Sequence, residues 1–399
     1  MCKMFRKLKK TLARFYAGAL TILAPLYRLV FNITNKAPQG EAFKRVVLLV
    51  SRPQDVDLLI SLNENARYRN NLTLLFWVTK NCAIKYPDVL RKLEEKHAVI
   101  DQIINFIHLS EILHKLMRID GFLSTVESTT AKGKLPYMIT KLANAASVPT
   151  YTLQHGFENV GLSYCDEAHG PDIKFAAKTV LTWGPTNELP SWVAKETRDK
   201  SIAVGCPNIL LASDNDPKVK LGERPIIAVF DNLHWDRFDQ EYISTFLNHL
   251  EEVSEERTSF RFILKSHPAS ARTRSSELKN RLRAMKRVVV ADMSDEEQAN
   301  LTTPSLMSRA LGVITTPSTI ALDGALSGVP VAITRYGLNL DYYSPLKLLD
   351  NLEDWHSFLD SLTESHPYKI LKLNGERFLK RVIVPGDPAE KILDLMTGH

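Results

Sequence analysis

Three polar groups follow three apolar runs in the second half of the chain. Asp231 ends the run that begins at Ile226, His267 follows the run 262–264, and a hydroxyl-rich stretch begins at Thr315. Each run has the length and composition of a strand buried in a parallel sheet. Because ligands of parallel α/β sheets bind at the carboxyl ends of the strands, we expect these groups to surround one crevice.

The hydroxyl-rich stretch predicts a phosphate contact. Thr316, Ser318 and Thr319 lie between an apolar run and a helical pattern. A helix N-terminus offers free N–H donors and a favourable dipole to a phosphate. The alternative is that Ser318 or Thr319 only caps its own helix. We expect a cap and, because the helix starts at a strand end, a phosphate contact in addition.

His267 precedes Pro268, which biases the histidine away from helix, so the strand is predicted to stop there. A histidine at this place can donate to a phosphate oxygen or protonate a leaving group. Lys265 stands two residues earlier and is a candidate cation for the same ligand. The alternative is a histidine that serves the fold alone.

Asp231 is the candidate nucleophile or base, because it is a carboxylate at a strand end. The alternative is an N-cap or Asx turn before the next helix. Asp236 and Asp239 are better placed for that structural role.

A second candidate group, Gln154, His155, Gly156 and Glu158, ends the last predicted strand of the first half. Gly156 permits a sharp turn and a close backbone approach. Glu158 would then stand at the lip of a cleft, where it could take a proton from an acceptor hydroxyl. The alternative is a solvated loop acid.

Strands and helices alternate along the chain, which predicts parallel sheets and an α/β fold. The predicted strands are 45–51, 72–79, 119–126, 149–153, 225–230, 261–264, 288–291, 312–315 and 330–333. The predicted helices are 55–67, 83–96, 135–146, 238–256, 274–285, 304–310, 320–327 and 389–397.

The region 186–223 contains three prolines and a charged run, which makes it the candidate boundary between two halves. We therefore expect two Rossmann-like domains of similar size facing a central cleft. The predicted parts are a basic and apolar segment at 1–36, a first domain at 37–185, a linker at 186–223, a second domain at 224–385 and a C-terminal helix at 386–399.

Neither a GxGxxG fingerprint nor a P-loop occurs, so any phosphate site must be built otherwise. Four scattered cysteines without a Cys/His cluster do not indicate zinc, and they favour a reduced, cytoplasmic setting. An acidic pair spaced for a metal, Asp55 and Asp57, falls in a predicted helix of the first domain, away from the predicted donor crevice. We therefore expect neither a metal nor another cofactor.

The first fourteen residues carry six basic side chains and no acid, and these account for the whole net charge of +6. A neutral remainder argues against a nucleic-acid-binding protein. The apolar stretch 15–27 is too short to span a bilayer. A basic segment with apolar residues suits a helix on an anionic membrane surface. The alternative is an ordinary helix packed on the body of the protein.

The stretches QHGFE, FD, KSHP and TTPSTIALDGALSGVPV together resemble bacterial GT-B glycosyltransferases of capsule and lipopolysaccharide assembly. They are most similar to the retaining β-Kdo transferases, which use CMP-Kdo (Kdo is 3-deoxy-D-manno-oct-2-ulosonic acid). The resemblance covers the organisation of residues 45–333. No acidic pair followed by glycine stands in the first half, which departs from the sialyltransferase pattern.

The resemblance implies roles for the candidate residues. Asp231 would attack the anomeric carbon as CMP leaves, and Glu158 would deprotonate the acceptor, with net retention. The CMP phosphate would be held by His267, Ser318 and Thr319. Candidate cations for the donor are Lys265, Arg52 and Arg335. The implied acceptor is a saccharide, lipid-linked and reached from the inner face of the bacterial inner membrane through residues 1–36.

Three other functions stay open at this point. A polyol-phosphate transferase with a CDP-glycerol-type donor would also need a histidine near a phosphate and a basic N-terminal helix. A CMP-sialic-acid transferase would share the donor nucleotide. A non-catalytic sugar-binding scaffold would bind cytidine nucleotides without turnover.

Overall fold

The computed structural model describes residues 18–25, 28, 43–104, 109–165, 172–207, 224–235, 237–293 and 301–398. Most of the predicted segment 1–36, the second part of the predicted linker and Asp236 lie outside the described residues. The chain divides into two compact units. The first unit comprises Met1–His155, Asn159–Asn208 and Ile383–His399, and the second comprises Gly156–Glu158 and Ile209–Val382.

The first unit is built on a parallel sheet with the strand order β3-β2-β1-β4-β5-β6-β7. The order reverses between β1 and β4, which makes their carboxyl ends the switch point where ligands of such sheets bind. The strands are β1 (Lys44–Val50), β2 (Leu72–Thr79), β3 (Val99–Ile104), β4 (Gly121–Ser124), β5 (Thr150–Leu153), β6 (Thr179–Thr182) and β7 (Ser201–Ala203).

Alternate residues of β1 point to opposite faces of the sheet, and on both faces they are apolar. Helices therefore cover both faces. Val46 and Leu48 pack in one core cluster, and Val47 and Leu49 pack in another. The helices are α2 (Pro53–Ala66), α3 (Lys80–Lys85), α4 (Asp88–Glu95), α5 (Leu109–Leu116), α6 (Lys134–Ala145), α7 (Lys195–Asp199) and α16 (Pro388–Thr397), with a 3-10 turn η2 (Thr186–Glu188).

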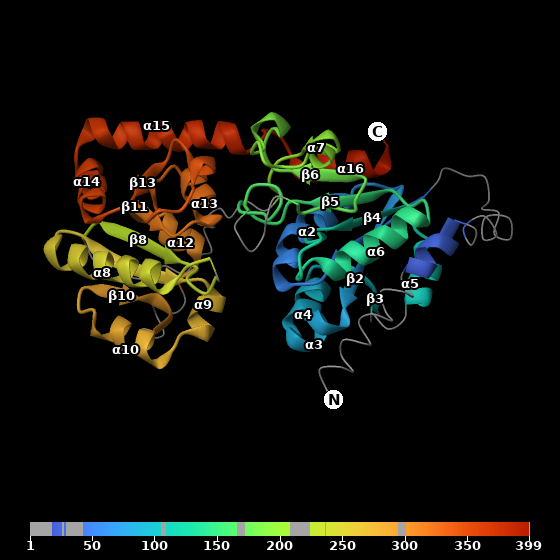
Figure 1. Ribbon diagram of the computed structural model, residues 1–399, viewed down its shortest axis with the longest axis horizontal. Coiled ribbons are helices and arrows are strands. Elements are labelled where there is room, and N and C mark those ends of the chain that lie inside the picture. The colour runs from blue at the N-terminus through green and yellow to red at the C-terminus, as the bar shows by residue number, and fades with distance from the viewer. Residues whose placement is uncertain are drawn as a thin grey trace. The chain divides into compact units, whose positions relative to one another are not determined.

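Two predicted boundaries differ from the structure. Residues 186–207 do not form a linker, because β7 pairs with β6 and extends the first sheet. The C-terminal helix is not a separate part, because α16 packs on α2 and buries Ile392 and Leu393 in the first core. Figure 1 shows α16 beside the elements of the first unit.

The second unit repeats the plan, with a parallel sheet in the order β10-β9-β8-β11-β12-β13. Its order reverses between β8 and β11, so their carboxyl ends form a second switch point. The strands are β8 (Ile226–Asp231), β9 (Arg261–Ser266), β10 (Val288–Val290), β11 (Ala310–Thr315), β12 (Val331–Thr334) and β13 (Lys347–Leu349).

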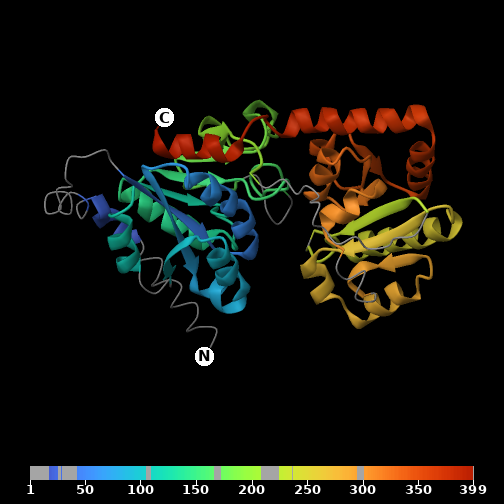
Figure 2. The ribbon, with the colours of Figure 1, turned by 180° about the vertical axis from the view of Figure 1, so that it is seen from behind.

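The helices of the second unit are α8 (Gln240–Glu256), α9 (Pro268–Thr273), α10 (Ser276–Ala284), α12 (Thr303–Met307), α13 (Ile320–Leu326), α14 (Leu352–Thr363) and α15 (Ser365–Val382), with 3-10 turns η3 (Ala291–Met293) and η4 (Asp341–Tyr343). Residues of α8, α10 and α14 share one core with β8 and β9. Figure 2 shows the elements of this unit from behind. The predicted alternation of strands and helices is confirmed in both units.

A short segment of the first half clusters with the second unit. The Phe157 ring stacks on Tyr342 with 4.8 Å between centroids and meets the edges of Tyr343 and Phe378. The Phe157 side chain is only 1% exposed, so this aromatic cluster fixes Gly156–Glu158 to the second unit.

Residues 18–25 of the predicted membrane-associating segment form a helix. Ala24 is buried in the core formed with α5 and α6, and Arg28 donates to the Met117 carbonyl at 2.8 Å. Ile22 and Leu23 are 79% and 55% exposed. This helix therefore packs on the first unit through one side and leaves two large apolar side chains uncovered. Among the described residues, no helix is long and apolar enough to cross a membrane.

Candidate functional site

Asp231 ends β8 at the switch point of the second sheet, as the sequence predicts. Its carboxylate is buried, and it accepts hydrogen bonds from the Ser266 hydroxyl and from the backbone N–H of Leu233. Arg274 donates to the same Ser266 hydroxyl and pairs with Asp292. Burial raises the pKa of Asp231, while Ser266 and the Arg274 charge lower it. The contact with Leu233 has the form of an Asx turn, so Asp231 also has the structural role considered as its alternative.

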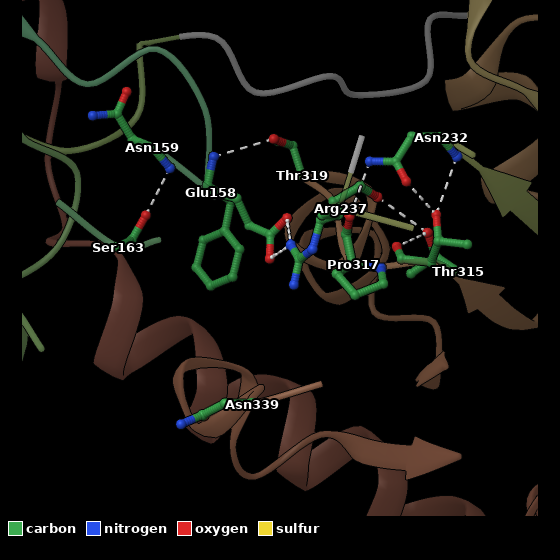
Figure 3. A network of polar contacts seen from close by, with 12 residues as sticks. Glu158, Asn159, Ser163, Asn232, Arg237, Thr315, Pro317, Thr319 and Asn339 are labelled. Atoms are coloured by element: carbon green, nitrogen blue, oxygen red, sulfur yellow. Dashed lines mark hydrogen bonds and ion pairs between the residues drawn. The ribbon is translucent and has the colours of Figure 1, made fainter. Parts of the chain in front are cut away.

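The hydroxyl-rich stretch follows β11, the neighbour of β8. The Thr316 hydroxyl donates to Asn232 Oδ1 at 2.6 Å and accepts from the Asn232 N–H at 3.1 Å. The Asn232 amide also donates to the Pro317 carbonyl at 3.0 Å, as Figure 3 shows. Thr316 is fully buried, so its hydroxyl ties two strand ends together and does not face a ligand. The predicted phosphate contact of Thr316 therefore lacks an available group.

Ser318 and Thr319 lie at the start of α13. The Ser318 hydroxyl is 3.1 Å from the Thr315 hydroxyl and accepts from the Ile320 N–H. Thr319 is the N-cap residue, but its side chain makes no capping bond and instead accepts from the Phe157 N–H at 3.1 Å. The expected cap therefore comes in part from Ser318, while the Thr319 hydroxyl holds the segment that carries Glu158.

Glu158 is not the solvated loop acid considered as its alternative. Arg237 donates from Nη1 to both carboxylate oxygens at 2.7 Å, and each side chain is 5% exposed. Figure 3 shows the two groups facing each other. Burial raises the pKa of Glu158, and the Arg237 charge opposes that shift. The structure thus places a paired and oriented carboxylate in the second unit.

His267 follows β9, and its ring is stacked on that of His234 with 4.7 Å between centroids. The His234 Nδ1 lies 2.8 Å from the Ser270 hydroxyl. Burial, with His234 and Arg272 nearby, lowers the pKa of His267 to about 4. His267 is therefore neutral at neutral pH, and it can donate a hydrogen bond to a phosphate but is a poor source of a proton.

Two of the candidate cations are engaged elsewhere. Lys265 donates from Nζ to the Leu301 carbonyl at 2.7 Å. Arg335 forms an ion pair with Asp350, with Nε 2.7 Å from the nearer oxygen. The Arg335 charge is thus compensated by Asp350, whereas Lys265 keeps a charge that no ion pair within the described residues compensates, and it is held in place by a neutral carbonyl.

Gln154 and Gly156 have roles other than the predicted ones. The Gln154 side chain accepts from the Trp183 N–H at 2.9 Å, which joins β5 to the end of β6. A Cβ atom at Gly156 would meet nothing closer than 3.7 Å, and the backbone is not left-handed there. The chain does bend at residues 156–158, as the sequence predicts, but neither the backbone conformation nor the space around Gly156 requires a glycine there.

Arg52 and His155 lie in the first unit, at the ends of β1 and β5. They do not belong to the group that surrounds Asp231. Asp55 is buried near them in α2, and Asp57 is exposed and paired with Lys92. No group of three or more potential metal ligands occurs among the residues that the structure describes.

Arg237, Asn232 and His234 were not predicted. All three lie in the loop after β8, so the strand-end rule that singled out Asp231 could also have selected them. Asp323 was missed as well. It is 3% exposed in α13, and burial raises the pKa of its carboxyl to about 7. An acid inside the pattern IALDGAL gives no sign of this, because its burial depends on tertiary packing.

Solved structures with the same fold cover almost the whole chain. A putative UDP-N-acetylglucosamine 2-epimerase from Listeria monocytogenes has a TM-score of 0.63 at 12% identity and covers 90% of this chain and 97% of its own. The UDP-GlcNAc 2-epimerase from Neisseria meningitidis, bound to UDP-GlcNAc, has a TM-score of 0.60 at 12% identity, with 89% and 100% covered. The wall teichoic acid polymerase TagF, in a structure with CDPG, has a TM-score of 0.53 at 11% identity, with 98% of both chains covered.

The fold is GT-B-like. Two Rossmann-like units of this kind are what the sequence predicts, and the similarity to these structures supports them. At identities of 11% and 12%, the similarity to these proteins shows a shared fold and nothing more. No protein-family model matches the chain, and no curated protein sequence matches it.

Proposed function

We propose that the chain is a glycosyltransferase that moves Kdo from CMP-Kdo to a saccharide acceptor with retention of configuration. The observation that carries this proposal is the position of Asp231 at the switch point of the second sheet. Its carboxylate is oriented by Ser266 and by the N–H of Leu233. A buried carboxylate that is held in place needs little reorganisation to act as a nucleophile.

In the proposed reaction, an Asp231 oxygen forms a bond to the anomeric carbon while the bond from that carbon to the CMP oxygen breaks. CMP leaves with the electron pair of the broken bond. The acceptor oxygen then displaces Asp231 from the opposite face, and Glu158 takes the acceptor proton. Two displacements at one carbon give net retention, as in retaining glycosidases. Arg237 favours the ionised form of Glu158, which a base requires.

The donor phosphate is assigned to Ser318, Thr319 and a neutral His267, at the start of α13 and the end of β9. The solved structures offer partial support, because the Neisseria epimerase is bound to UDP-GlcNAc and the TagF structure contains CDPG. We propose that this chain binds a nucleotide-activated donor in the same kind of fold. Neither a metal nor another cofactor enters the proposed reaction.

Intact-protein mass spectrometry after incubation with CMP-Kdo tests the proposal. Wild type, Asp231→Asn and Glu158→Gln should be compared, with Asp292→Asn as a control that removes the carboxylate paired with Arg274. We expect an adduct of one Kdo residue that accumulates in Glu158→Gln and maps to residue 231. An adduct on another residue would overturn the role of Asp231, and a donor that is neither bound nor consumed would overturn the donor.

A polyol-phosphate transferase with a CDP-glycerol-type donor is the second candidate. The stacked rings of His234 and His267 favour it, since two neighbouring imidazoles after β8 and β9 can both donate hydrogen bonds to a phosphate. The coverage of 98% of both chains in the TagF comparison also favours it. Asp231→Ala separates the two, because phosphoryl transfer needs no carboxylate nucleophile. Substantial turnover of CDP-glycerol by this variant would establish the second candidate.

We also propose that the acceptor is lipid-linked and that the protein works on the inner face of the bacterial inner membrane. The exposed Ile22 and Leu23, in a segment preceded by six basic side chains, support contact with an anionic lipid surface. Binding to vesicles of anionic lipid tests this contact directly.

A further inference from the structure

The first sheet has a switch point of its own, and its polar groups take no part in the reaction proposed above. Thr125 directly follows β4, while Arg52 and His155 follow β1 and β5 after one residue each. The strands β1, β4 and β5 are adjacent and parallel, so these three residues stand at one edge of one sheet. Ligands of open α/β sheets bind at this edge.

Arg52 carries a charge that forms no ion pair among the described residues. The residue is half-buried, and among the described parts of the chain its guanidinium has neither an ion pair nor a hydrogen-bond partner. Burial lowers the pKa of Arg52, and the Asp55 charge opposes this only in part. Burying a cation without a paired anion costs free energy. The binding of an anion beside Arg52 would recover part of that cost.

Asp55 attracts Arg52 by its charge, but its oxygens accept their hydrogen bonds from other groups. One oxygen accepts from the backbone N–H groups of Ser51 and Arg52 and from the Ser51 hydroxyl. The other accepts from the Thr125 hydroxyl at 2.6 Å. Asp55 thus joins the ends of β1 and β4, and it leaves the five N–H donors of the guanidinium available.

His155 adds a second unsatisfied group. Its Nδ1 is buried, and within the described residues it has no hydrogen-bond partner. The nearby Asn159 Oδ1 is buried and unsatisfied in the same way. Burial and the Arg52 charge together lower the pKa of His155 to about 3, against the opposing effect of the Thr125 backbone and the Asn159 side chain. The ring is therefore neutral at neutral pH, and in the tautomer with the proton on Nδ1 this nitrogen can donate to an anion.

We propose that Arg52 and His155 form an oxyanion-binding site in the first unit, and that this site takes a phosphate or carboxylate group of the acceptor. The guanidinium supplies two parallel donors to such a group, and the imidazole supplies one more. Recognition of the acceptor by this group rests on the proposed transferase function. Binding of an oxyanion at this place does not.

Inorganic phosphate is the probe for the site. The full chain, with isotope-labelled histidines, is titrated with phosphate while the His155 ring nitrogens are followed by NMR, and the signal is assigned with His155→Gln. We expect a saturable shift and a higher pKa of His155, because a bound anion offsets the Arg52 charge. A His155 signal that phosphate leaves unmoved would overturn the inference.

Two variants and a control make the result specific. Arg52→Gln should weaken phosphate binding about tenfold or more, the size expected for a lost charged hydrogen bond. Arg52→Lys keeps the charge but loses the paired donors, so it should bind with intermediate affinity. Arg91→Gln removes an exposed arginine of the same unit and should bind as the wild type does. Equal binding by Arg52→Gln and wild type, both folded by thermal melting, would contradict the site.

Two further measurements distinguish the two possible sources of the oxyanion, the acceptor and the Kdo carboxylate. If the acceptor supplies it, phosphate competes with the acceptor, and Arg52→Gln raises the KM for an acidic acceptor more than for its neutral analogue. If the Kdo carboxylate supplies it, the variant instead weakens the binding of CMP-Kdo relative to CMP, and the assignment to the acceptor is wrong. Phosphate binding without any turnover of CMP-Kdo would leave the site standing and remove the proposed function.

Discussion

Glu158 and Arg237 form a buried ion pair in which one guanidinium nitrogen lies 2.7 Å from both carboxylate oxygens. Glu158 comes from the first half of the sequence and Arg237 from the loop after β8. Glu158 is also the candidate base. The same variants can therefore measure both the stability that the ion pair contributes and the catalytic role of Glu158.

Loss of Arg237 should be costly. Arg237→Gln leaves the Glu158 charge buried without a partner, and we expect the free energy of unfolding to fall by about 3 kcal/mol. The double variant Glu158→Gln/Arg237→Gln should lose less than the two single changes together. Urea denaturation measures both effects.

Arg335 provides the matched control for this change. Its ion pair with Asp350 is more exposed, at 41% and 33% for the two side chains. Arg335→Gln should therefore cost no more than about 1 kcal/mol. Equal losses for Arg237→Gln and Arg335→Gln would mean that burial does not govern the strength of the first pair.

Thr319 should matter through its hydroxyl. Thr319→Val removes the acceptor of the Phe157 N–H and leaves that group unpaired, at a cost of about 1–3 kcal/mol. Thr319→Ser keeps the hydroxyl and should retain most of the stability. Both variants need donor titrations as well. Weakened CMP binding in the valine variant alone would support the predicted phosphate contact, and equal CMP affinity in both would count against it.

Asp323 predicts a dependence of stability on pH. Burial raises its pKa to about 7, so the folded protein holds a proton that the unfolded chain loses above about pH 4. This group therefore costs stability as the pH rises, by about 1.4 kcal/mol for each unit that separates the two pKa values. Asp323→Asn should be more stable than wild type at about pH 8, and the gain should vanish at about pH 4.

Chemical denaturation of wild type and Asp323→Asn across this pH range measures the difference. Taking the difference removes the opposite contribution of His155 and His267. Their lowered pKa values make stability increase with pH up to about 6.5. A gain for Asp323→Asn that does not change with pH would show that the carboxyl is not protonated in the folded state.

Ile22 and Leu23 predict membrane contact through a small apolar surface. The double variant Ile22→Glu/Leu23→Glu should reduce binding to anionic vesicles, because acidic side chains are repelled and the apolar area is lost. Its thermal stability should stay close to that of wild type, since both side chains are exposed. Vesicle co-sedimentation measures the binding. Unchanged binding would assign membrane contact to another part of the chain or remove it.

The sequence predicts every inner strand except β6, and among the edge strands it predicts only β10. β8 and β11 are continuous apolar runs, and such runs identify central strands. β3 was missed because Asp101 and Gln102 interrupt its apolar pattern at the edge of the sheet. The sequence does not predict β6, β7 and β13, because three or four residues of mixed polarity carry too little periodicity. The equally short β10 is predicted because it is an unbroken run of valines.

The sequence predicts where the candidate residues lie relative to the strands, but it does not predict which side chains they contact. Asp231 and His267 do stand at strand ends, but their partners Ser266 and His234 depend on the packing of neighbouring strands and loops. Thr316 shows the limit of the method. It lies in the predicted stretch, yet its hydroxyl is used by Asn232, 84 residues away in the chain. No local pattern contains such a pairing.

The position of α16 in the first unit has a consequence for the order in which the protein can fold during synthesis. Ala389, Ile392, Leu393 and Met396 complete the core around β1 and β2. The ribosome therefore synthesises all of the second unit before the core of the first unit can be completed. Domains that fold as they emerge usually do so from the N-terminus onward. In this protein the second unit has every strand of its sheet available earlier, while the first must wait, with part of its apolar surface uncovered.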